Sequence, residues 1–419
     1  MIKDIKIRKI KQIFCQDSIP DIPEYIHQAF NSSDLLSRIK PGDKIGITVG
    51  SRGISNINSI VKQIVIELKN IQAKPLILSA MGSHGGANSE GQRKVLASYG
   101  ITEKEMGVPI LSSMETIQIG KVENNIPIYF SKDAMQIDGI ISLNRVKSHT
   151  DFKSNIVESG MSKMLVIGLG KEKGARTIHS LGIYGLKSII QKAAKLILSK
   201  APIIQGIGIL ENGYNQTMKI SFVPPGNIIC SDSELLKVYK EVIPMLPIEE
   251  LDVVITQEIG KNISGTGFDT NVIGRLYING EKEIIKPRIK GLVVFDITEE
   301  SNGNAIGIGL ADITTRHLAD KINYKDMYAN TITSTFLNRA KIPIIANTER
   351  EAVEIAVKTC WKLEQSNLKL LIMKNTSNLE YLYVSKEVWE KIKKNKNIEA
   401  YGYWEELTFD KNGLMEQRI

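Results

Sequence analysis

Two strand-like segments joined by one amphipathic helix constrain the fold of this chain more than any other feature. Lys44–Val49 and Pro75–Ala80 are β-rich runs, and the apolar residues between them recur at positions 57, 60, 61, 64, 65 and 68, on one face of a helix. Strand, helix and strand in succession form a β-α-β unit, whose two strands lie parallel with a right-handed crossover. The segment therefore predicts an α/β fold with a largely parallel sheet.

The alternation of strands and helices continues along the chain, which at 419 residues is long enough for two domains. Pro244 and Pro247 interrupt the pattern, so we expect an N-terminal α/β domain over 1–245 and a C-terminal α/β domain over 246–419. The second domain would close an interdomain active-site cleft, with its last residues able to pack back on the first. Further strands are predicted at 5–14, 116–120, 126–130, 139–143, 204–210, 218–223, 251–256, 291–297, 342–346 and 369–374, and further helices at 22–30, 186–197, 234–243 (capped by Ser231-Asp232-Ser233), 304–318 and 349–361.

Composition narrows the class of protein. With 42% hydrophobic and 24% charged residues, the chain has the make-up of a globular protein. Its net charge of +8 is spread over scattered lysines, which favours small anionic ligands over nucleic acid. The three cysteines are far apart, and no apolar run reaches the roughly 18 residues of a membrane span. We expect a cytoplasmic protein without membrane or nucleic-acid partners, and a homo-oligomer stays open.

Basic side chains follow three of the predicted strands. Arg52 comes after Lys44–Val49, His84 after Pro75–Ala80, and the group from Arg145 to His149 after the strand at 139–143. Loops at the carboxyl ends of parallel strands line the ligand crevice of an α/β sheet. The three loops are therefore predicted to converge on one anion.

Each of these residues has two interpretations. Arg52 can grip a carboxylate with two parallel hydrogen bonds, or pair with a nearby surface acid. His84 lies in a glycine-rich turn that seldom needs a histidine for packing, so a general base is favoured. His149, with Asp151 to orient it, is either a second base, as a reaction on two faces such as racemisation requires, or part of a structural His-Asp pair. For His27, a helix residue, we favour a structural role.

The segment from Gly160 to His179 holds a second group of candidates. Lys163 has apolar neighbours that would lower its pKa and make its amine nucleophilic, unless the side chain extends to the helix end and water. His179 follows Lys163 by 16 residues and is either a metal ligand or a structural histidine. The glycine-rich stretch between them predicts a loop that cradles one phosphate; its candidate residues are Gly168, Gly170, Lys171, Lys173 and Gly174.

These motifs together resemble the lactate racemase family, over roughly residues 40 to 200. The resemblance implies that Lys163 tethers a nickel-pincer nucleotide, a pyridinium thioamide/thiocarboxylate mononucleotide with Ni(II), and that His179 donates to nickel. It also implies that His84 and His149 are the catalytic histidines and that Arg52 binds the substrate carboxylate. Lys261 is the counterpart expected for a substrate-binding lysine in the second domain. Proteins that synthesise the cofactor are implied as partners.

The sequence departs from the family at Ser51-Arg52-Gly53, at His84-Gly85-Gly86 and in a longer gap between His149 and Lys163. The resemblance therefore implies a divergent member, a racemase or epimerase of a 2-hydroxy acid other than lactate racemase proper. One histidine would take the hydroxyl proton as hydride passes to the pincer ring, and the other would return a proton on the opposite face. The alternatives are a binding protein for an anionic metabolite that uses the same basic loops, and a metal hydrolase built on His84, His149 and His179.

Overall fold

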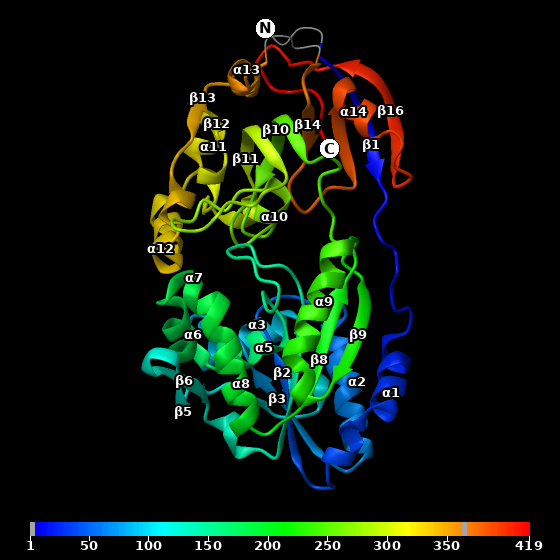
Figure 1. Cartoon of the computed structure of the whole chain (residues 1–419), viewed down its shortest axis with the longest axis vertical. Helices are drawn as coiled ribbons and strands as arrows, with labels where there is room; N and C mark the ends of the chain where they lie inside the picture. Colours follow the sequence, from blue (N-terminus) through cyan, green and yellow to red (C-terminus); the bar gives the residue numbers. More distant parts are fainter. Residues whose placement is uncertain (1–4, 363–366) are drawn as a thin grey trace. The chain divides into compact units, whose positions relative to one another are not determined.

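A computed structural model describes residues 5–362 and 367–419 of the chain. They form two compact units (Figure 1). The N-terminal unit is Cys15–Ile243, and the C-terminal unit combines the described residues up to Phe14 with Pro244–Ile419. The units thus divide two residues before the expected boundary at 245. Assigning the first residues to the N-terminal domain was wrong, because the apolar side of strand β1 (Lys6–Gln12) is buried in the sheet of the C-terminal unit.

The N-terminal unit is built on a six-stranded sheet of order β4-β3-β2-β7-β8-β9. All neighbouring strands are parallel except β9, which forms a hairpin with β8. The predicted β-α-β unit and the α/β fold are confirmed. The strands are β2 (Lys44–Val49), β3 (Lys74–Ser79), β4 (Ile110–Leu111), β7 (Gly139–Arg145), β8 (Ile203–Glu211) and β9 (Thr217–Val223).

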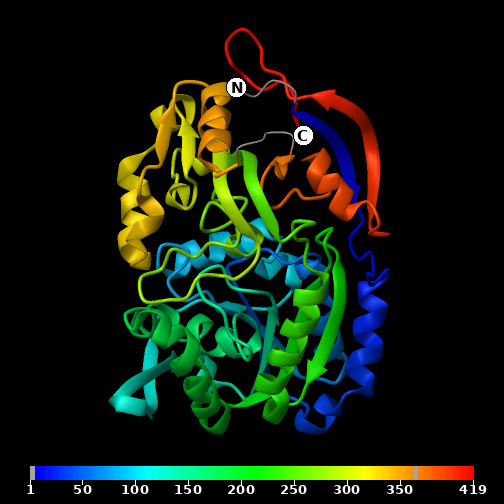
Figure 2. The same cartoon turned by 45° about the horizontal axis from the view of Figure 1, so that its top comes forward.

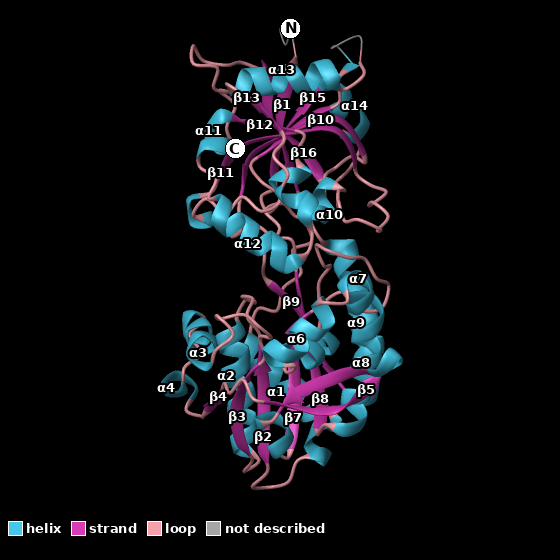
Figure 3. Ribbon diagram, turned by 90° about the vertical axis from the view of Figure 1, so that its left-hand side faces the viewer, coloured by secondary structure: helices cyan, strands magenta, loops and turns pink. Residues whose placement is uncertain are grey.

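Helices cover both faces of this sheet (Figure 3), because alternate strand residues point to opposite sides. Ile77 packs with one helical layer, whereas Leu76 and Leu78 pack with the other. The first layer holds α1 (Ile22–Ser32), α2 (Ile57–Asn70), α3 (Ser89–Ser98) and α4 (Glu103–Met106); the second holds α5 (Met161–Lys163), a π-helical turn η4 (Met164–Gly168), α6 (Lys171–His179), α8 (Ile190–Lys200), α9 (Ile228–Val242) and the hairpin of β5 (Thr116–Val122) and β6 (Ile126–Ser131). The unit is a three-layer α/β/α sandwich.

The C-terminal unit has an eight-stranded sheet of order β13-β12-β11-β10-β14-β15-β1-β16. Its first five strands are parallel, and β15, β1 and β16 add antiparallel pairs; Figure 2 shows β1 (blue) beside β16 (red). The elements are β10 (Glu250–Ile259), α10 (Thr270–Ile273), β11 (Arg288–Ile297), β12 (Ile313–Thr315), α11 (Arg316–Asp320), α12 (Tyr324–Ser334), β13 (Ile344–Ala346), α13 (Glu349–Thr359), β14 (Leu370–Met373), β15 (Tyr381–Ser385), α14 (Lys386–Ile392) and β16 (Ile398–Glu406).

Two expectations for the C-terminal unit were wrong. The helix predicted over 304–318 is replaced by the strand β12 and the short helix α11, because the β-branched residues of β12 pair between β11 and β13. The last residues pack within their own unit: the Arg418 guanidinium donates to the Glu349 carboxylate at 2.8 Å, and the Gln257 amide donates to the Gln417 carbonyl at 2.9 Å. Among the described helices, none combines the length and the apolar character needed to cross a bilayer.

Candidate functional site

The carboxyl end of the parallel sheet in the N-terminal unit carries the predicted substrate-side residues. Arg52 follows β2, His84 follows β3 and His149 follows β7. Each of them is close enough to a cofactor-side candidate to interact electrostatically: Arg52 lowers the pKa of Lys163, Lys163 lowers that of His149, and His84 lowers that of His179. The structure therefore brings these side chains together at one end of the sheet. Arg145 is the exception among the predicted basic residues, because it pairs with the Glu211 carboxylate.

The turn that carries His84 is set by glycine conformations. Gly82, Gly85 and Gly86 have φ angles of +57°, +67° and +67°, a region that residues with a Cβ seldom occupy. A Cβ on Gly85 would lie 2.7 Å from the backbone nitrogen of Gln92. The chain then enters α3, where the Asn88 side chain accepts the Gly91 N–H at 2.8 Å and caps the helix.

The His84 ring is held in one tautomer. Its Nδ1 lies 3.0 Å from the carbonyl oxygen of Met81. Because a carbonyl oxygen only accepts hydrogen bonds, Nδ1 is the donor, and in the neutral ring Nε2 is the nitrogen that can take up a proton. His84 is thus arranged to accept a proton at Nε2.

A buried polar network lies beneath this turn. The Lys171 ammonium donates to the Ser79 carbonyl at 2.6 Å and to the Ser79 hydroxyl at 3.0 Å. That hydroxyl donates to the Gln92 amide oxygen at 2.8 Å. The Gln92 NH₂ group donates in turn to the carbonyls of Gly82, at 3.1 Å, and His84, at 3.3 Å. The network links α6, β3 and α3 to the backbone of His84.

The predicted phosphate loop from Gly168 to Gly174 is not a loop. Most of it lies in η4 and α6, and its glycines serve close packing: a Cβ on Gly168 would come 2.7 Å from the Ala80 carbonyl oxygen. Lys171 is only 2% exposed, and burial lowers its pKa to about 8. Assigning Lys171 to phosphate binding was wrong, because its ammonium points into the protein and is already bonded to Ser79.

His149 is held in the opposite tautomer. Its Nδ1 accepts the backbone N–H of Asp151 at 3.0 Å, so Nε2 carries the single ring proton. The ring packs against Phe152, with centroids 4.7 Å apart. Burial, and then the charge of Lys163, hold the pKa of His149 well below its usual value of 6.5, so the ring is neutral near pH 7. His149 therefore presents an N–H donor where His84 presents an acceptor.

Lys163 ends the short helix α5, at the start of the π-helical turn η4. Burial lowers its pKa to about 8, and the carboxylate of Asp151 acts in the other direction. Within residues 5–362 and 367–419, its ammonium has no hydrogen-bond or ion-pair partner. An unpaired amine that titrates near pH 8 has the chemistry of a nucleophile.

His179 is the last residue of α6 and is exposed. Desolvation, and then the charge of Lys163, lower its pKa to about 4, so its imidazole is neutral and able to donate to a metal. The described residues include no cluster of three His, Cys, Asp or Glu side chains placed to hold a metal. The three histidines of the hydrolase alternative therefore do not form a metal site of their own.

Lys261 belongs to the C-terminal unit, where it follows β10. Its backbone N–H donates to the Ser301 hydroxyl at 2.8 Å, and its ammonium donates to the Asn330 side-chain oxygen at 2.5 Å. Its role as a substrate contact stays a prediction. His27, for which a structural role was favoured, bonds with Nδ1 to the Glu67 carboxylate at 3.0 Å.

The sequence did not predict the roles of two buried carboxylates. Glu158 accepts the backbone N–H of His149 at 2.8 Å, and Asp232 accepts the N–H groups of Met161 and Ser162 at 2.9 and 2.8 Å. The sequence suggested a helix cap at Asp232, but α9 begins at Ile228, and the carboxylate binds the first turn of α5 instead. The available signal for Glu158 was an acid between two candidate residues in a segment without helix or strand periodicity.

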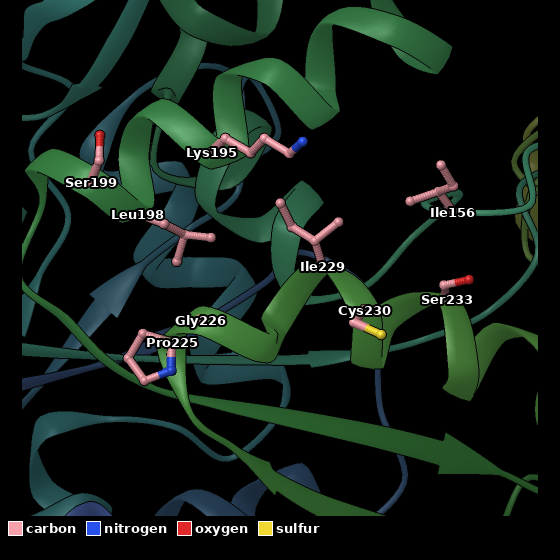
Figure 4. A pocket seen from close by; sticks show the side chains of 9 residues that line it. All are labelled: Ile156, Lys195, Leu198, Ser199, Pro225, Gly226, Ile229, Cys230 and Ser233. Atoms are coloured by element: carbon pink, nitrogen blue, oxygen red, sulfur yellow. The ribbon is translucent and has the colours of Figure 1, made fainter.

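A surface pocket of about 670 Å³ lies between α8, α9 and the segment that contains Ile156 (Figure 4). It is lined by Ile156, Lys195, Leu198, Ser199, Pro225, Gly226, Ile229, Cys230 and Ser233, none of which is a candidate site residue. Its walls are mainly apolar. The chemistry described above therefore lies outside this pocket, and Ile156 connects the pocket to the loop after His149.

Comparison with known proteins shows which family model and which solved fold the chain is similar to. The family model described as the lactate racemase N-terminal domain matches residues 7–188, which include Arg52, His84, His149, Lys163 and His179. No curated protein matches the chain. Among solved structures, the chain is similar to the lactate racemase apoprotein from Thermoanaerobacterium thermosaccharolyticum, with a TM-score of 0.55 and 11% sequence identity over 88% of this chain and 99% of that one. This likeness shows a shared fold.

Proposed function

We propose, from the match of residues 7–188 to the lactate racemase N-terminal domain and from the shared fold, that the chain is a divergent member of the lactate racemase family and interconverts the stereoisomers of a 2-hydroxy acid. One observation carries the proposal: two histidines at the same end of the sheet are held in opposite tautomers. His84 has a lone pair on Nε2, and His149 has a proton there. Removal of the hydroxyl proton needs such an acceptor, and the negative charge that develops on the substrate oxygen is stabilised by such a donor.

The chain's own residues have separate tasks in this reaction. The Arg52 guanidinium binds the substrate carboxylate with two hydrogen bonds and so fixes the orientation of the hydroxy acid. His84 accepts the hydroxyl proton at Nε2 as the substrate is oxidised to a planar 2-keto acid. His149 donates a hydrogen bond from its Nε2–H to the substrate oxygen, and the proton held by His84 returns to that oxygen as the hydroxyl of the opposite stereoisomer is restored.

The α-C–H bond of a 2-hydroxy carboxylate is too weakly acidic for a histidine, so the reaction needs a hydride acceptor. The nickel-pincer nucleotide of the family supplies reversible hydride transfer when it is bound. Two residues fit such a group: Lys163, whose unpaired amine suits a covalent tether, and His179, whose neutral imidazole suits a nickel ligand. The predicted phosphate-binding stretch from Gly168 to Gly174 is largely helical, and the Lys171 ammonium within it is bonded to Ser79.

Two measurements test the proposal. The full chain, produced together with cofactor-synthesis proteins and nickel, is screened against single enantiomers of 2-hydroxy acids by chiral chromatography. We expect racemisation or epimerisation of at least one acid, and its loss on substitution of both His84 and His149. A protein that binds hydroxy acids without turnover would support the binding alternative and contradict the proposal.

The tether is tested by intact mass. We expect the wild-type chain to carry the added mass of one nucleotide adduct and Lys163→Ala to lack it. Lys173→Ala is the matched control, because Lys173 is exposed and its ammonium lies over the Tyr129 ring, 4.3 Å from the centroid. An adduct retained in Lys163→Ala would show that the cofactor is attached elsewhere.

A further inference from the structure

The helix that carries Lys163 begins on a buried carboxylate. Asp232, in α9, is fully buried, and its two oxygens accept the N–H groups of Met161 and Ser162, the first two residues of α5. Gly160 precedes them with φ of +129°, and a Cβ on it would lie 2.3 Å from the Asp232 oxygen. Glycine at 160 and the acid at 232 thus form one arrangement, which fixes the backbone one residue before Lys163.

The loop that carries His149 is closed by a second buried carboxylate. Glu158 has no exposed side-chain area, and its oxygens accept the N–H groups of His149 and Ser154 at 2.8 and 3.0 Å. The ammonium of Lys240, also in α9, donates to Glu158 at 2.8 Å and to the Ser154 carbonyl at 3.1 Å. The Ser233 hydroxyl of α9 donates to the Asn155 carbonyl at 2.7 Å.

Both arrangements have the same origin in α9. Burying an ionised carboxylate is costly unless hydrogen bonds and opposite charges compensate, and here each acid is used to bind backbone N–H groups of a segment that carries a reactive side chain. Burial raises the pKa of Asp232 to about 6, so its hydrogen bonds do not fully offset the cost of burying the carboxylate charge. A helix needed only for packing would require neither the Asp232 carboxylate nor the Lys240 ammonium that binds Glu158, since its apolar face already packs through Ile228, Leu235 and Leu236.

We propose that Asp232 and Glu158 are positioning residues, which hold Lys163 and His149 in register with each other through α9. Asp232 fixes the start of α5, and Glu158, paired with Lys240 at 2.8 Å and with Lys153 at 4.0 Å, fixes the loop from His149 to Ser154. This inference rests on the proposed function for the roles of Lys163 and His149. The positions themselves are measurable without substrate or cofactor.

The Lys163 branch is tested by acetylation of the full-length protein with limiting acetic anhydride at pH 8, read by peptide mass spectrometry. With a pKa of about 8, roughly half of the Lys163 amine is reactive there, compared with well under 1% for an ordinary lysine of pKa ~10.4. We expect Asp232→Asn to lower the rate at Lys163 at least tenfold, because the loosened helix exposes the amine to water. The rate at Lys195, an exposed lysine, should not change.

The His149 branch is tested by NMR titration of the histidine rings. We expect Lys240→Met and Glu158→Gln to raise the pKa of His149 toward 6.5, because the freed loop admits water. Lys240→Arg keeps the cation and should preserve the wild-type titration. Lys237→Met is the matched control, since Lys237 is an exposed lysine on the same helix.

Folding is followed by circular dichroism, so that a variant that fails to fold is recognised. Lys240→Met is the variant expected to fold, because the Lys240 side chain is partly exposed. Unchanged Lys163 acetylation in folded Asp232→Asn, or an unchanged His149 titration in folded Lys240→Met, would overturn the positioning roles. These readouts are independent of racemase activity. An inactive wild type with the expected shifts would refute the proposed function alone.

Discussion

The two histidine-bearing segments of the site are fixed in different ways. The His84 turn is short and depends on backbone conformation: positive φ angles at Gly82, Gly85 and Gly86, with an amide side chain and a buried lysine beneath it. The His149 loop, which runs to Gly160 without regular structure, depends on charge, through the buried carboxylate of Glu158 and the ammonium of Lys240.

This difference follows from the number of residues between the strand and the helix that flank each segment. The segment between β3 and α3 covers only residues 80–88, and its glycine conformations and the Gln92 amide beneath it set its backbone. A loop of more than ten residues has many conformations, and ordering it requires strong, directional bonds from elsewhere in the fold. The His84 turn should therefore be sensitive to a Cβ, and the His149 loop to loss of a charge.

The largest expected effect is on the His84 turn. Gly85→Ala combines a left-handed backbone with a Cβ 2.7 Å from the Gln92 nitrogen, so we expect a loss of roughly 3 kcal/mol in the free energy of unfolding. Gly182→Ala is the control for backbone strain alone, because its φ is +57° and a Cβ there meets no atom within 4 Å. Gly182→Ala should lower the free energy of unfolding by about 1 kcal/mol. Equal losses in urea unfolding would show that the turn tolerates the added Cβ.

The support beneath the turn comes next. Lys171→Met removes the buried ammonium and leaves the Ser79 carbonyl without that donor, so we expect a loss of about 2 kcal/mol in urea unfolding. Lys173→Met, two residues on and exposed, should change stability by less than about 0.5 kcal/mol. If Lys171 instead bound phosphate, its substitution would weaken phosphate binding and leave stability unchanged.

Local sequence pattern predicted the elements on which the site is built, and long-range contacts decided the rest. The β-α-β unit and the amphipathic helices carry their periodicity within a few residues, and the low pKa of Lys163 follows from its apolar neighbours. The glycines at 168 and 170 are ambiguous, because a phosphate loop and close helix packing both require a missing side chain. The Ala80 carbonyl that decides between them is far away in the chain.

The same limit applies to charged residues. Asp232 was interpreted as a local helix cap, since nothing near it in sequence indicates that it binds Met161 and Ser162, about seventy residues earlier. The alternation of apolar residues correctly predicted strand β1. It did not predict which domain the strand belongs to, because the alternation does not specify the strands with which it pairs. The chemistry of a side chain could be predicted where it depends on residues nearby in sequence. The distant residues that hold that side chain in place could not.

The charge environment of the His149 region gives the third prediction. Burial, together with the charges of Lys147 and Arg52, lowers the pKa of Lys163 to about 8. The acetylation rate of Lys163 should therefore be half-maximal near pH 8 and rise above it, because only the deprotonated amine reacts. Peptide mass spectrometry across pH 6 to 11 measures this profile, with exposed Lys195 as the internal reference. If the pH profiles of Lys163 and Lys195 coincide, burial does not lower the pKa of Lys163.

The smallest effect is a difference in nitrogen chemical shifts, and it addresses the comparison most directly. The Met81 carbonyl keeps the proton of His84 on Nδ1, and the Asp151 N–H keeps that of His149 on Nε2. Near pH 7.5, ¹⁵N-labelled histidine should give a protonated-type Nδ1 and an unprotonated-type Nε2 for His84, with the reverse pattern for His149. Single substitutions to glutamine, His84→Gln and His149→Gln, assign the two sets. The same tautomer in both rings would remove the acceptor and donor pair on which the two-face reaction depends.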